Sequence, residues 1–304
     1  MTAFAEAAGR LAQALGGGPA ADLAAAALIE ADALGQTRFG IAMLDEWTPD
    51  CAAPPTVGPS GVVSWRDCSA SFAPLAVASA TLDLAASARE HGMAAVFLRG
   101  IRGFGRQAPF VRHLADAGLV GLACAEGPPF VAPHGGSAPV IGTNPLALAM
   151  GTGGAQVVID AASSSTTMAA LRAARAAGTA LPDGTALDGE GRLTRNAAEV
   201  AALLPRGGQI GSLLGLMVEL LAGVLGGGRG DPRGRGVVLL AIDPSAAGTG
   251  IDWQASLAAL RRDWIAGGGY WPRGASMVDG SRLDAGFAQR LDAQLARMAA
   301  RVAP

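Results

Sequence analysis

The chain has 304 residues, half of which are apolar, and its formal net charge is −2. That length and apolar fraction allow a large buried core, built as one elaborate domain or as two interlocked lobes. All 23 positively charged residues are arginine and no basic stripe is present, so a Schiff-base lysine and a nucleic-acid-binding surface are both excluded.

The predicted elements alternate between helices and strands along the chain. The first part predicts helices over 3–15 and 20–34, a strand at 61–65 within a loop-rich stretch, a helix over 72–91, a strand at 94–98, a helix over 108–117 and a strand at 119–123. The second part predicts strands at 146–150 and 157–159, helices over 166–177, 196–204 and 211–225, a strand at 237–242, and helices over 253–266 and 284–301. This alternation is typical of an α/β protein.

The division of the chain that we expect has three parts. A helical, substrate-side region (1–70) would pack with the C-terminal helices (246–304), and residues 71–245 would form a central α/β domain of the cofactor-binding type.

The cysteines and the apolar runs indicate the cellular compartment of the protein. Cys51, Cys68 and Cys124 are odd in number and lack C-x-x-C spacing, so neither a disulfide framework nor a metal site is indicated. The N-terminus has no charged segment followed by an apolar run, and we expect no signal peptide. The apolar run at 213–225 is interrupted by Glu219 and is too short to span a bilayer, which favours a buried helix. A cytoplasmic protein with no membrane partner is therefore expected.

A glycine-rich turn follows the predicted strand at 94–98. Residues 99–106 contain Gly103, Phe104 and Gly105 and three arginines, so backbone amides could approach a phosphate that the arginines neutralise. The spacing is not G-x-G-x-x-G, and no acidic residue stands where a ribose would need it. A plain tight turn is the alternative interpretation.

Two further stretches carry groups that can move protons. His134 lies on a loop between proline and two glycines, where an imidazole can titrate, and the loop Gly142-Thr143-Asn144-Pro145 follows it. Asp160 follows the apolar run at 157–159, the position at which α/β sheets place ligands. The alternatives are a hydrogen-bonded loop histidine, and an aspartate that caps the following helix.

Several ordered motifs resemble those of one enzyme family. They are Ala132-Pro133-His134-Gly135-Gly136, Gly142-Thr143-Asn144-Pro145-Leu146-Ala147, Ile159-Asp160-Ala161-Ala162-Ser163, and the runs at 117–121, 181–184, 187–191, 207–208 and 217–225. In these the chain resembles the malate/L-lactate dehydrogenase-like family of NAD(P)-dependent oxidoreductases. The resemblance implies a mixed-sheet α/β fold that is not a Rossmann fold. It also implies a homodimer, and hydride transfer from NAD(P)H to a 2-oxo acid or a cyclic imine.

The sequence departs from the family pattern at the positions that carry its chemistry. Phe39 occupies the place of the family's proton-transferring histidine, and Arg38 that of the neighbouring serine. Met43 stands where an arginine grips the substrate carboxylate, Gly103 replaces a second histidine, and Ile210 replaces a lysine. Phenylalanine cannot transfer a proton, and losing a general acid costs about 10²–10⁴-fold in rate.

These departures lead to one main hypothesis and two alternatives. The main one is a divergent NAD(P)H-dependent oxidoreductase that reduces C=O or C=N in an unusual substrate of specialised metabolism. The alternatives are a cofactor-free elimination, isomerisation or condensation, for which NAD(P)H binding would be lost, and a non-catalytic dimeric partner. The predicted catalytic residues are Asp160, His134 and Arg38. The predicted cofactor-binding residues are Gly103, Phe104, Gly105, Gly142, Thr143, Asn144 and Pro145, and the substrate pocket would contain Phe39 and Met43.

Overall fold

The computed structural model divides the chain into two compact units. It describes residues 3–52, 55–58, 61–231, 234–248, 250, 252–272 and 283–302. Unit 1 comprises Met1–Ala123, Ala147–Asp160 and Leu239–Pro304, and unit 2 comprises Cys124–Leu146 and Ala161–Val238. The three-part division expected from the sequence stays a prediction. Parts of the predicted loops, at 53–54, 59–60 and 232–233, lie outside the described residues.

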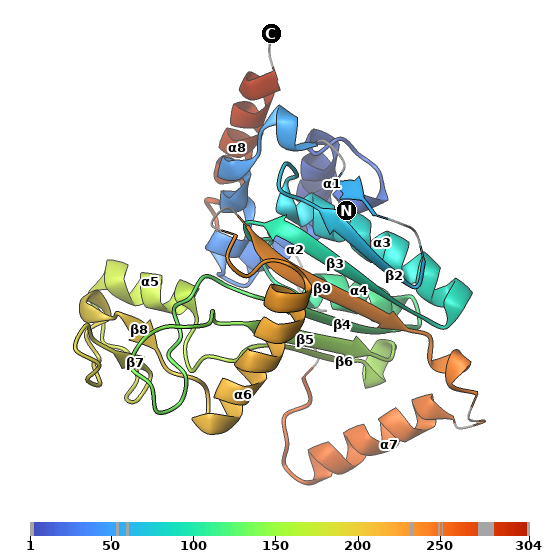
Figure 1. Ribbon diagram of the computed structural model, residues 1–304. Coiled ribbons are helices and arrows are strands. Elements are labelled where there is room, and N and C mark those ends of the chain that lie inside the picture. The colour runs from blue at the N-terminus through green and yellow to red at the C-terminus, as the bar shows by residue number, and fades with distance from the viewer. Residues whose placement is uncertain are drawn as a thin grey trace. The chain divides into compact units, whose positions relative to one another are not determined.

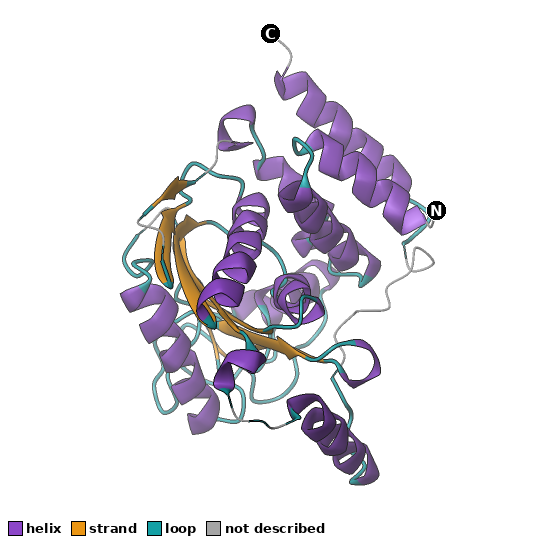
Figure 2. Cartoon of the chain, turned by 90° about the vertical axis from the view of Figure 1, so that its right-hand side faces the viewer, coloured by secondary structure: helices purple, strands orange, loops and turns teal. Residues whose placement is uncertain are grey.

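Seven strands form one mixed sheet, drawn as a twisted layer in Figure 2. Its order is β1-β2-β3-β9-β4-β5-β6. The strands are β1 (Thr56–Val57), β2 (Val63–Asp67), β3 (Met93–Ile101), β4 (Val120–Ala125), β5 (Pro145–Met150), β6 (Val157–Ala162) and β9 (Arg235–Ile242). β1 pairs with β2 antiparallel, and β2 pairs with β3 parallel, with Val63 opposite Ala95. This arrangement confirms the predicted mixed-sheet α/β class.

Alanine-rich helices build the core of unit 1. They are α1 (Ala3–Ala14), α2 (Pro19–Ala33), α3 (Ala73–His91), α4 (Ala108–Asp116), α7 (Trp253–Ala266) and α8 (Phe287–Val302) (Figure 1). α3 packs on β3 and α2, while α2 also contacts α1 and α4. Ala24 and Ala25 of α2 and Ala80 of α3 are fully buried. Such small side chains bring helices close together, so the many alanines produce tight helix packing.

Unit 2 contains short elements around a small apolar core. They are α5 (Met168–Ala177), β7 (Ala186–Leu187), β8 (Ala202–Leu203), α6 (Gln209–Val218) and the π-helical η6 (Glu219–Leu225). The core cluster includes Val131, Ile141, Leu171, Val200 and Leu203.

The prediction of a helix over 196–204 is wrong. Only one 3-10 turn, η5 (Ala197–Glu199), forms there, and the Asn196 side chain caps it by accepting from Ala198 N at 3.1 Å. The next residues join β8, which pairs antiparallel with β7. Leu203 thereby enters the apolar core and donates its N–H to Phe130 O at 2.8 Å. Strand pairing with residues distant in sequence has overridden the local helical pattern.

The helix predicted over 211–225 forms as α6 and η6, but its predicted burial is wrong. Apart from Val218, its buried face consists of small or polar residues such as Gly211, Gly215 and Ala222. The exposed face carries large apolar side chains, which we call the apolar ridge: Ile210, Leu213, Leu214, Leu216, Met217, Leu220, Leu221, Val224 and Leu225. Across the described part of the chain, no helix combines the length and apolarity needed to cross a bilayer.

Candidate active site

The glycine-rich turn after β3 is shorter than predicted. β3 continues through Ile101, so Arg99 is a strand residue opposite Asp67. Arg99 forms an ion pair with Asp67 at 3.3 Å and lies over the Trp65 ring at 4.5 Å. This arginine is therefore committed to the sheet, and the turn itself contains Gly103 and Gly105.

Gly105 brings the turn against the segment that bears the altered family positions. It has φ +88°, and a methyl group added to it would lie 2.9 Å from Phe39 O and 3.5 Å from Met43 Sδ. Phe39 and Met43 are half-buried beside it, whereas Arg38 is exposed. Phe104 is buried and its ring packs edge-on against Phe110 at 5.7 Å. The structure thus brings the two predicted pocket residues to the predicted cofactor turn.

Asp32 holds this segment in place from α2. Its Oδ2 accepts from Ile41 N at 2.7 Å, and a methyl group on Gly40 would lie only 1.9 Å from the same oxygen. Burial raises the pKa of Asp32, although the Ile41 hydrogen bond and the Arg290 charge oppose the rise. Asp32 therefore anchors the loop that carries Phe39, whose side chain cannot transfer a proton.

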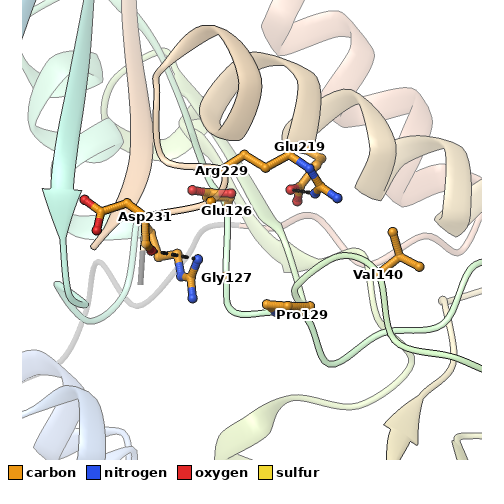
Figure 3. A pocket seen from close by; sticks show the side chains of 9 residues that line it. Glu126, Gly127, Pro129, Val140, Glu219, Arg229 and Asp231 are labelled. Carbon is orange, nitrogen blue, oxygen red and sulfur yellow. Dashed lines mark hydrogen bonds and ion pairs between the residues drawn. The ribbon is translucent and has the colours of Figure 1, made fainter. Parts of the chain in front are cut away.

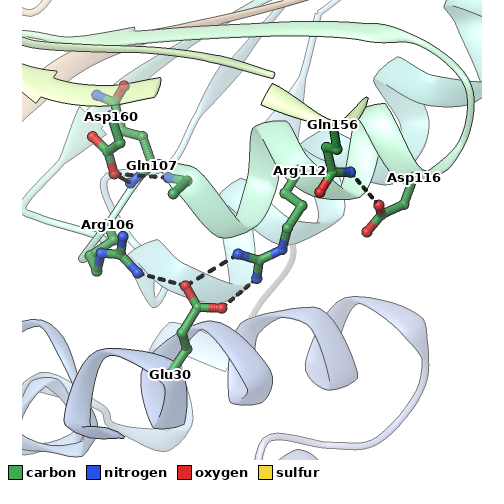
Figure 4. A network of polar contacts seen from close by, with 8 residues as sticks. Glu30, Arg106, Gln107, Arg112, Asp116, Gln156 and Asp160 are labelled. Carbon is green, nitrogen blue, oxygen red and sulfur yellow. Dashed lines mark hydrogen bonds and ion pairs between the residues drawn. The ribbon is translucent and has the colours of Figure 1, made fainter. Parts of the chain in front are cut away.

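Asp160 lies within β6 rather than after it, because the strand continues to Ala162. Its Oδ2 accepts from Ala108 N at 2.9 Å and from Gln107 N at 3.1 Å, so it binds the amino end of α4 (Figure 4). Thr167, not Asp160, caps the following helix α5. Packing of the carboxyl group raises the pKa of Asp160, while the Ala108 N–H, the Arg106 charge and the Gln107 N–H lower it.

The arginine at the end of the turn is also committed to a structural contact. Glu30 is buried, and its carboxylate accepts from Arg106 at 2.5 Å and forms an ion pair with Arg112 (Figure 4). Of the three arginines in the predicted phosphate turn, two therefore serve the protein's own carboxylates. Arg102 is the third, and it is exposed.

The turn still has groups that fit a phosphate-bearing cofactor. Gly103 is exposed with φ +151°, and among the described residues nothing beyond its chain neighbours lies within 4 Å of where a Cβ would be. A phosphate could therefore approach its backbone closely, with the Arg102 guanidinium beside it.

In unit 2, the loop 142–145 is locked by its own asparagine. Asn144 is fully buried with φ +36°. Its Oδ1 accepts from Gly127 N at 3.0 Å, and its Nδ2 donates to Gly215 O and to Glu219 Oε2, both at 2.9 Å. Thr143 O accepts from Ser163 N at 3.0 Å. The side chain of Asn144 thus positions the loop through contacts with the protein's own groups.

His134 is exposed near the start of α6. Its backbone N–H donates to Ser212 Oγ at 3.1 Å, and a methyl group on Gly208 would lie 3.4 Å from its ring.

Sequence reasoning missed a pair of carboxyl groups in unit 2. Glu126 and Glu219 are both buried and line a cavity of about 300 Å³ (Figure 3). Glu126 follows β4 directly, a position like the one that drew attention to Asp160, and Glu219 interrupts the apolar run of α6 and η6. These two positions could be read from the sequence, but the burial and the pairing of the two glutamates are seen only in the structure.

Neither cysteines nor a metal cluster adds to these sites. Cys68 and Cys124 are buried free thiols, and burial raises their pKa values to about 12 and about 11. Within the described ranges, no group of three or more His, Cys, Asp or Glu side chains could hold a metal ion.

Comparison with known proteins identifies the family. The model of the family described as malate/L-lactate dehydrogenase matches residues 7–266. The chain belongs to the malate/L-lactate dehydrogenase family. This match confirms the resemblance seen in the motifs from residue 117 to residue 225.

Curated members of the family share part of their length with this chain. A Δ1-pyrroline-2-carboxylate reductase of Ancylobacter novellus is 37% identical over 194 residues, covering 59% of this chain and 57% of the relative. A (2R)-3-sulfolactate dehydrogenase (NADP(+)) of Chromohalobacter salexigens is 39% identical over 173 residues, covering 52% of each protein. In these matches the chain spans about half the length of the curated relatives.

Solved structures of the malate/L-lactate dehydrogenase family have the same fold over nearly the whole chain. The Δ1-piperideine-2-carboxylate reductase from Pseudomonas syringae pvar. tomato matches with a TM-score of 0.78 and 27% identity. That match covers 99% of this chain and 100% of the reductase chain. The predicted fold is therefore confirmed, including the regions where the motifs are absent.

Proposed function

We propose that this chain is a divergent NAD(P)H-dependent oxidoreductase that reduces a C=O or C=N bond in a small substrate of specialised metabolism. The observation that supports it is the match of the family model to residues 7–266. Similar proteins are named as a reductase and a dehydrogenase. The loop 142–145 and Asp160 are retained within that match. A cytoplasmic location stays a prediction.

The altered residues indicate a substrate that differs from malate or lactate. Phe39 and Met43 are half-buried and apolar, and they lie beside Gly105 where the family has polar groups. Methionine cannot form a bidentate clamp on a carboxylate. We therefore propose a less anionic, more apolar substrate, with Arg38 available to bind any remaining anionic group.

The predicted groups divide between cofactor binding and proton transfer. Gly103 and Arg102 would hold a cofactor phosphate, and the bound nicotinamide would supply the hydride. The loop 142–145 would shape the pocket through its backbone, since the Asn144 side chain is fully engaged. Asp160 and His134 stay the proton-handling groups predicted from the sequence.

A homodimer is the second part of this proposal. The apolar ridge exposes large side chains, of which Ile210 is 71% exposed and Leu225 is 66% exposed. A contiguous apolar surface of this kind marks an interaction site in most proteins. Because family members are expected to be homodimers, we propose that a second copy of the chain covers this ridge.

A cofactor-free reaction is the second candidate function. The observation that favours it is the commitment of Arg99 to Asp67 and of Arg106 to Glu30. Of the three arginines in the predicted phosphate turn, only Arg102 then has no carboxylate partner among the described residues.

Titration with NADPH and NADH, followed by nicotinamide fluorescence, distinguishes the two candidates. We expect binding in the micromolar range, and Arg102→Ala should weaken it because a phosphate contact is lost. The matched control is Arg262→Ala, which removes an exposed arginine from α7 and should leave binding unchanged. No binding of either nucleotide at millimolar concentration would overturn the reductase proposal in favour of cofactor-free chemistry.

A further inference from the structure

The C-terminal helix α8, drawn in red in Figure 1, lies beyond residues 7–266, to which the family model matches. It packs against η2 (Ile41–Glu46), the 3-10 turn that contains Met43, and both elements belong to unit 1. Polar side chains recur along α8 every three or four positions and therefore share one face of the helix: Arg290, Gln294, Arg297 and Arg301. Each of these four side chains contacts η2 or the residues next to it.

Arg301 holds the carboxyl end of η2. Its guanidinium donates to Leu44 O at 3.2 Å, to Asp45 O at 3.3 Å and to Trp47 O. Carbonyl groups at the end of a helix have few partners within it, and a cation there is favoured by the helix dipole. A short 3-10 turn has weak hydrogen bonds of its own. The position of this end of η2 therefore depends on a side chain of α8.

The side chain of Asp45 is held by the preceding turns of α8. Its Oδ1 accepts from Gln294 Nε2 at 3.1 Å and lies 3.6 Å from the guanidinium of Arg297. Gln294 is buried, so its amide has few alternative positions. Main chain and side chain of η2 are thus fixed by the same helix.

The other end of η2 is anchored by Asp32, which also faces α8. Asp32 Oδ2 accepts from Ile41 N at 2.7 Å, and the guanidinium of Arg290 lies 4.0 Å from Asp32 Oδ1. Asp284 accepts from Arg290 at 2.7 and 2.9 Å and keeps it in this position. Met43 follows Ile41 by two residues and precedes Leu44 by one. It therefore lies between two anchors that both contact α8.

The position of Met43 determines the shape of the predicted pocket. A methyl group on Gly105 would lie 3.5 Å from Met43 Sδ and 2.9 Å from Phe39 O, so the pocket segment and the predicted cofactor turn are in close contact. A shift of η2 would move the apolar side chain of Met43 relative to that turn. A displacement of about 1 Å in a site of this kind can cost about 10²-fold in activity.

Resting on the proposed function, we propose that α8 sets the substrate specificity of this enzyme and that Arg301 is a positioning residue. Arg301 contacts carbonyl groups of the segment 44–47 and acts through them on Met43. The part of the substrate that α8 selects is its apolar part, because Phe39 and Met43 are the side chains that the segment offers.

Hydrogen–deuterium exchange on the full chain tests the positioning role without any substrate. Arg301→Met keeps the length of the side chain but removes its donors, so peptides covering residues 41–47 should exchange faster while those covering β3 should not change. Arg301→Lys, which keeps a cation able to donate to a carbonyl group, should restore part of the protection. The matched control is Gln289→Ala on the exposed face of α8, which should leave the exchange unchanged.

Steady-state kinetics test the specificity role. The full chain would be assayed with NAD(P)H and two substrates that differ by one methylene, found by screening 2-oxo acids and cyclic imines. In Arg301→Met we expect KM to rise by up to about 10²-fold with kcat nearly unchanged, since binding is lost equally before and during the reaction. A fitted apolar pocket discriminates one methylene by about 10–200-fold, and this ratio of kcat/KM values should shrink. Nucleotide affinity should not change, because Arg102 and Gly103 are untouched.

The outcomes separate this inference from the proposed function. Unchanged exchange over 41–47 in Arg301→Met would show that α8 does not hold the segment, and the inference would be overturned whatever the activity. Faster exchange with unaltered KM and an unaltered substrate ratio would overturn the specificity role. If the unaltered chain neither binds nucleotide nor reduces any substrate, the proposed function fails, and the specificity role fails with it.

Discussion

At the scale of single residues, Asp160 combines an observed structural contact with a predicted chemical role. Its Oδ2 accepts from Gln107 N and Ala108 N, more than fifty positions earlier in the chain. The sequence places an aspartate near the end of a strand but cannot show which helix its carboxylate will bind. Both predicted roles, ligand contact and helix cap, were therefore reasonable, and the observed cap serves α4 instead of the next helix.

Asp160→Asn tests the structural part of this role. The variant should lower the free energy of unfolding by about 1 kcal/mol, because a charged acceptor at a helix N-terminus is lost. Urea unfolding followed by circular dichroism measures the change, and Asp263→Asn on the exposed surface of α7 is the control. A variant that unfolds like the unaltered chain but loses activity would identify Asp160 as catalytic instead. One that keeps its activity would exclude the predicted catalytic role.

Glu126 makes a second residue-scale prediction, which does not depend on activity. Because its pKa is raised in the folded chain, folding disfavours its ionised form. Below the unfolded value of about 4.5 both states are protonated and the group has no effect. As pH rises through the folded pKa, stability is lost at a rate of up to about 1.4 kcal/mol per pH unit.

The measurement is the stability of Glu126→Gln relative to the unaltered chain as a function of pH. The difference should move in favour of glutamine from about pH 4.5 upward and become constant above the folded pKa. A difference that stays flat from acid to neutral pH would mean that Glu126 ionises normally despite its burial.

At the scale of secondary-structure elements, α6 and η6 carry the largest contrast between sequence and structure. A run apolar on all sides predicts a helix buried on all sides, and the helix is present. Its inward face, however, is formed mainly by glycine and alanine with Val218 and Glu219, which leaves the leucines outside. Hydrophobic periodicity records which residues avoid water. It does not show whether the surface that buries these residues belongs to the same chain or to another chain.

The apolar ridge makes a prediction about assembly. Light scattering on purified protein should give twice the chain mass of 30.2 kDa. The double variant Leu220→Asp and Val224→Asp should give the monomer mass, because burying two carboxylates in an apolar interface is costly. Leu193→Asp changes an equally exposed leucine outside the ridge and should stay dimeric. A dimer that survives the double variant would place the interface elsewhere.

The lengths of two strands also differ from those predicted from the sequence. β3 and β6 both run three residues past their predicted ends, to Ile101 and Ala162. Pairing with neighbouring strands extends them, and the partners come from distant parts of the sequence. The length of a strand is therefore a tertiary property. By contrast, α3 ends as predicted and begins one residue later than predicted, because Pro74 and Gly92 are local signals.

At the scale of the whole molecule, the fold was predictable and much of the site was not. The ordered motifs identified the family, which the match over residues 7–266 confirms. They also located the residues that depart from it, and the structure brings Phe39 and Met43 to Gly105. The pair of Glu126 and Glu219 lay beyond reach, because its two members are separated by 92 intervening residues and only folding brings them together.

The position of β9 in the sheet has a consequence for how the chain is made. β9 lies between β3 and β4, although it is the last strand along the described part of the chain. Until residues 235–242 leave the ribosome, the neighbouring edges of β3 and β4 have no strand between them, and unpaired edges of this kind invite aggregation. Folding of the sheet must wait for the last quarter of the chain. Truncation before residue 235 would therefore remove a central strand of the sheet and not an edge strand. Chaperone dependence and slow, topology-limited folding are the expected costs of placing a late strand in the middle of the sheet.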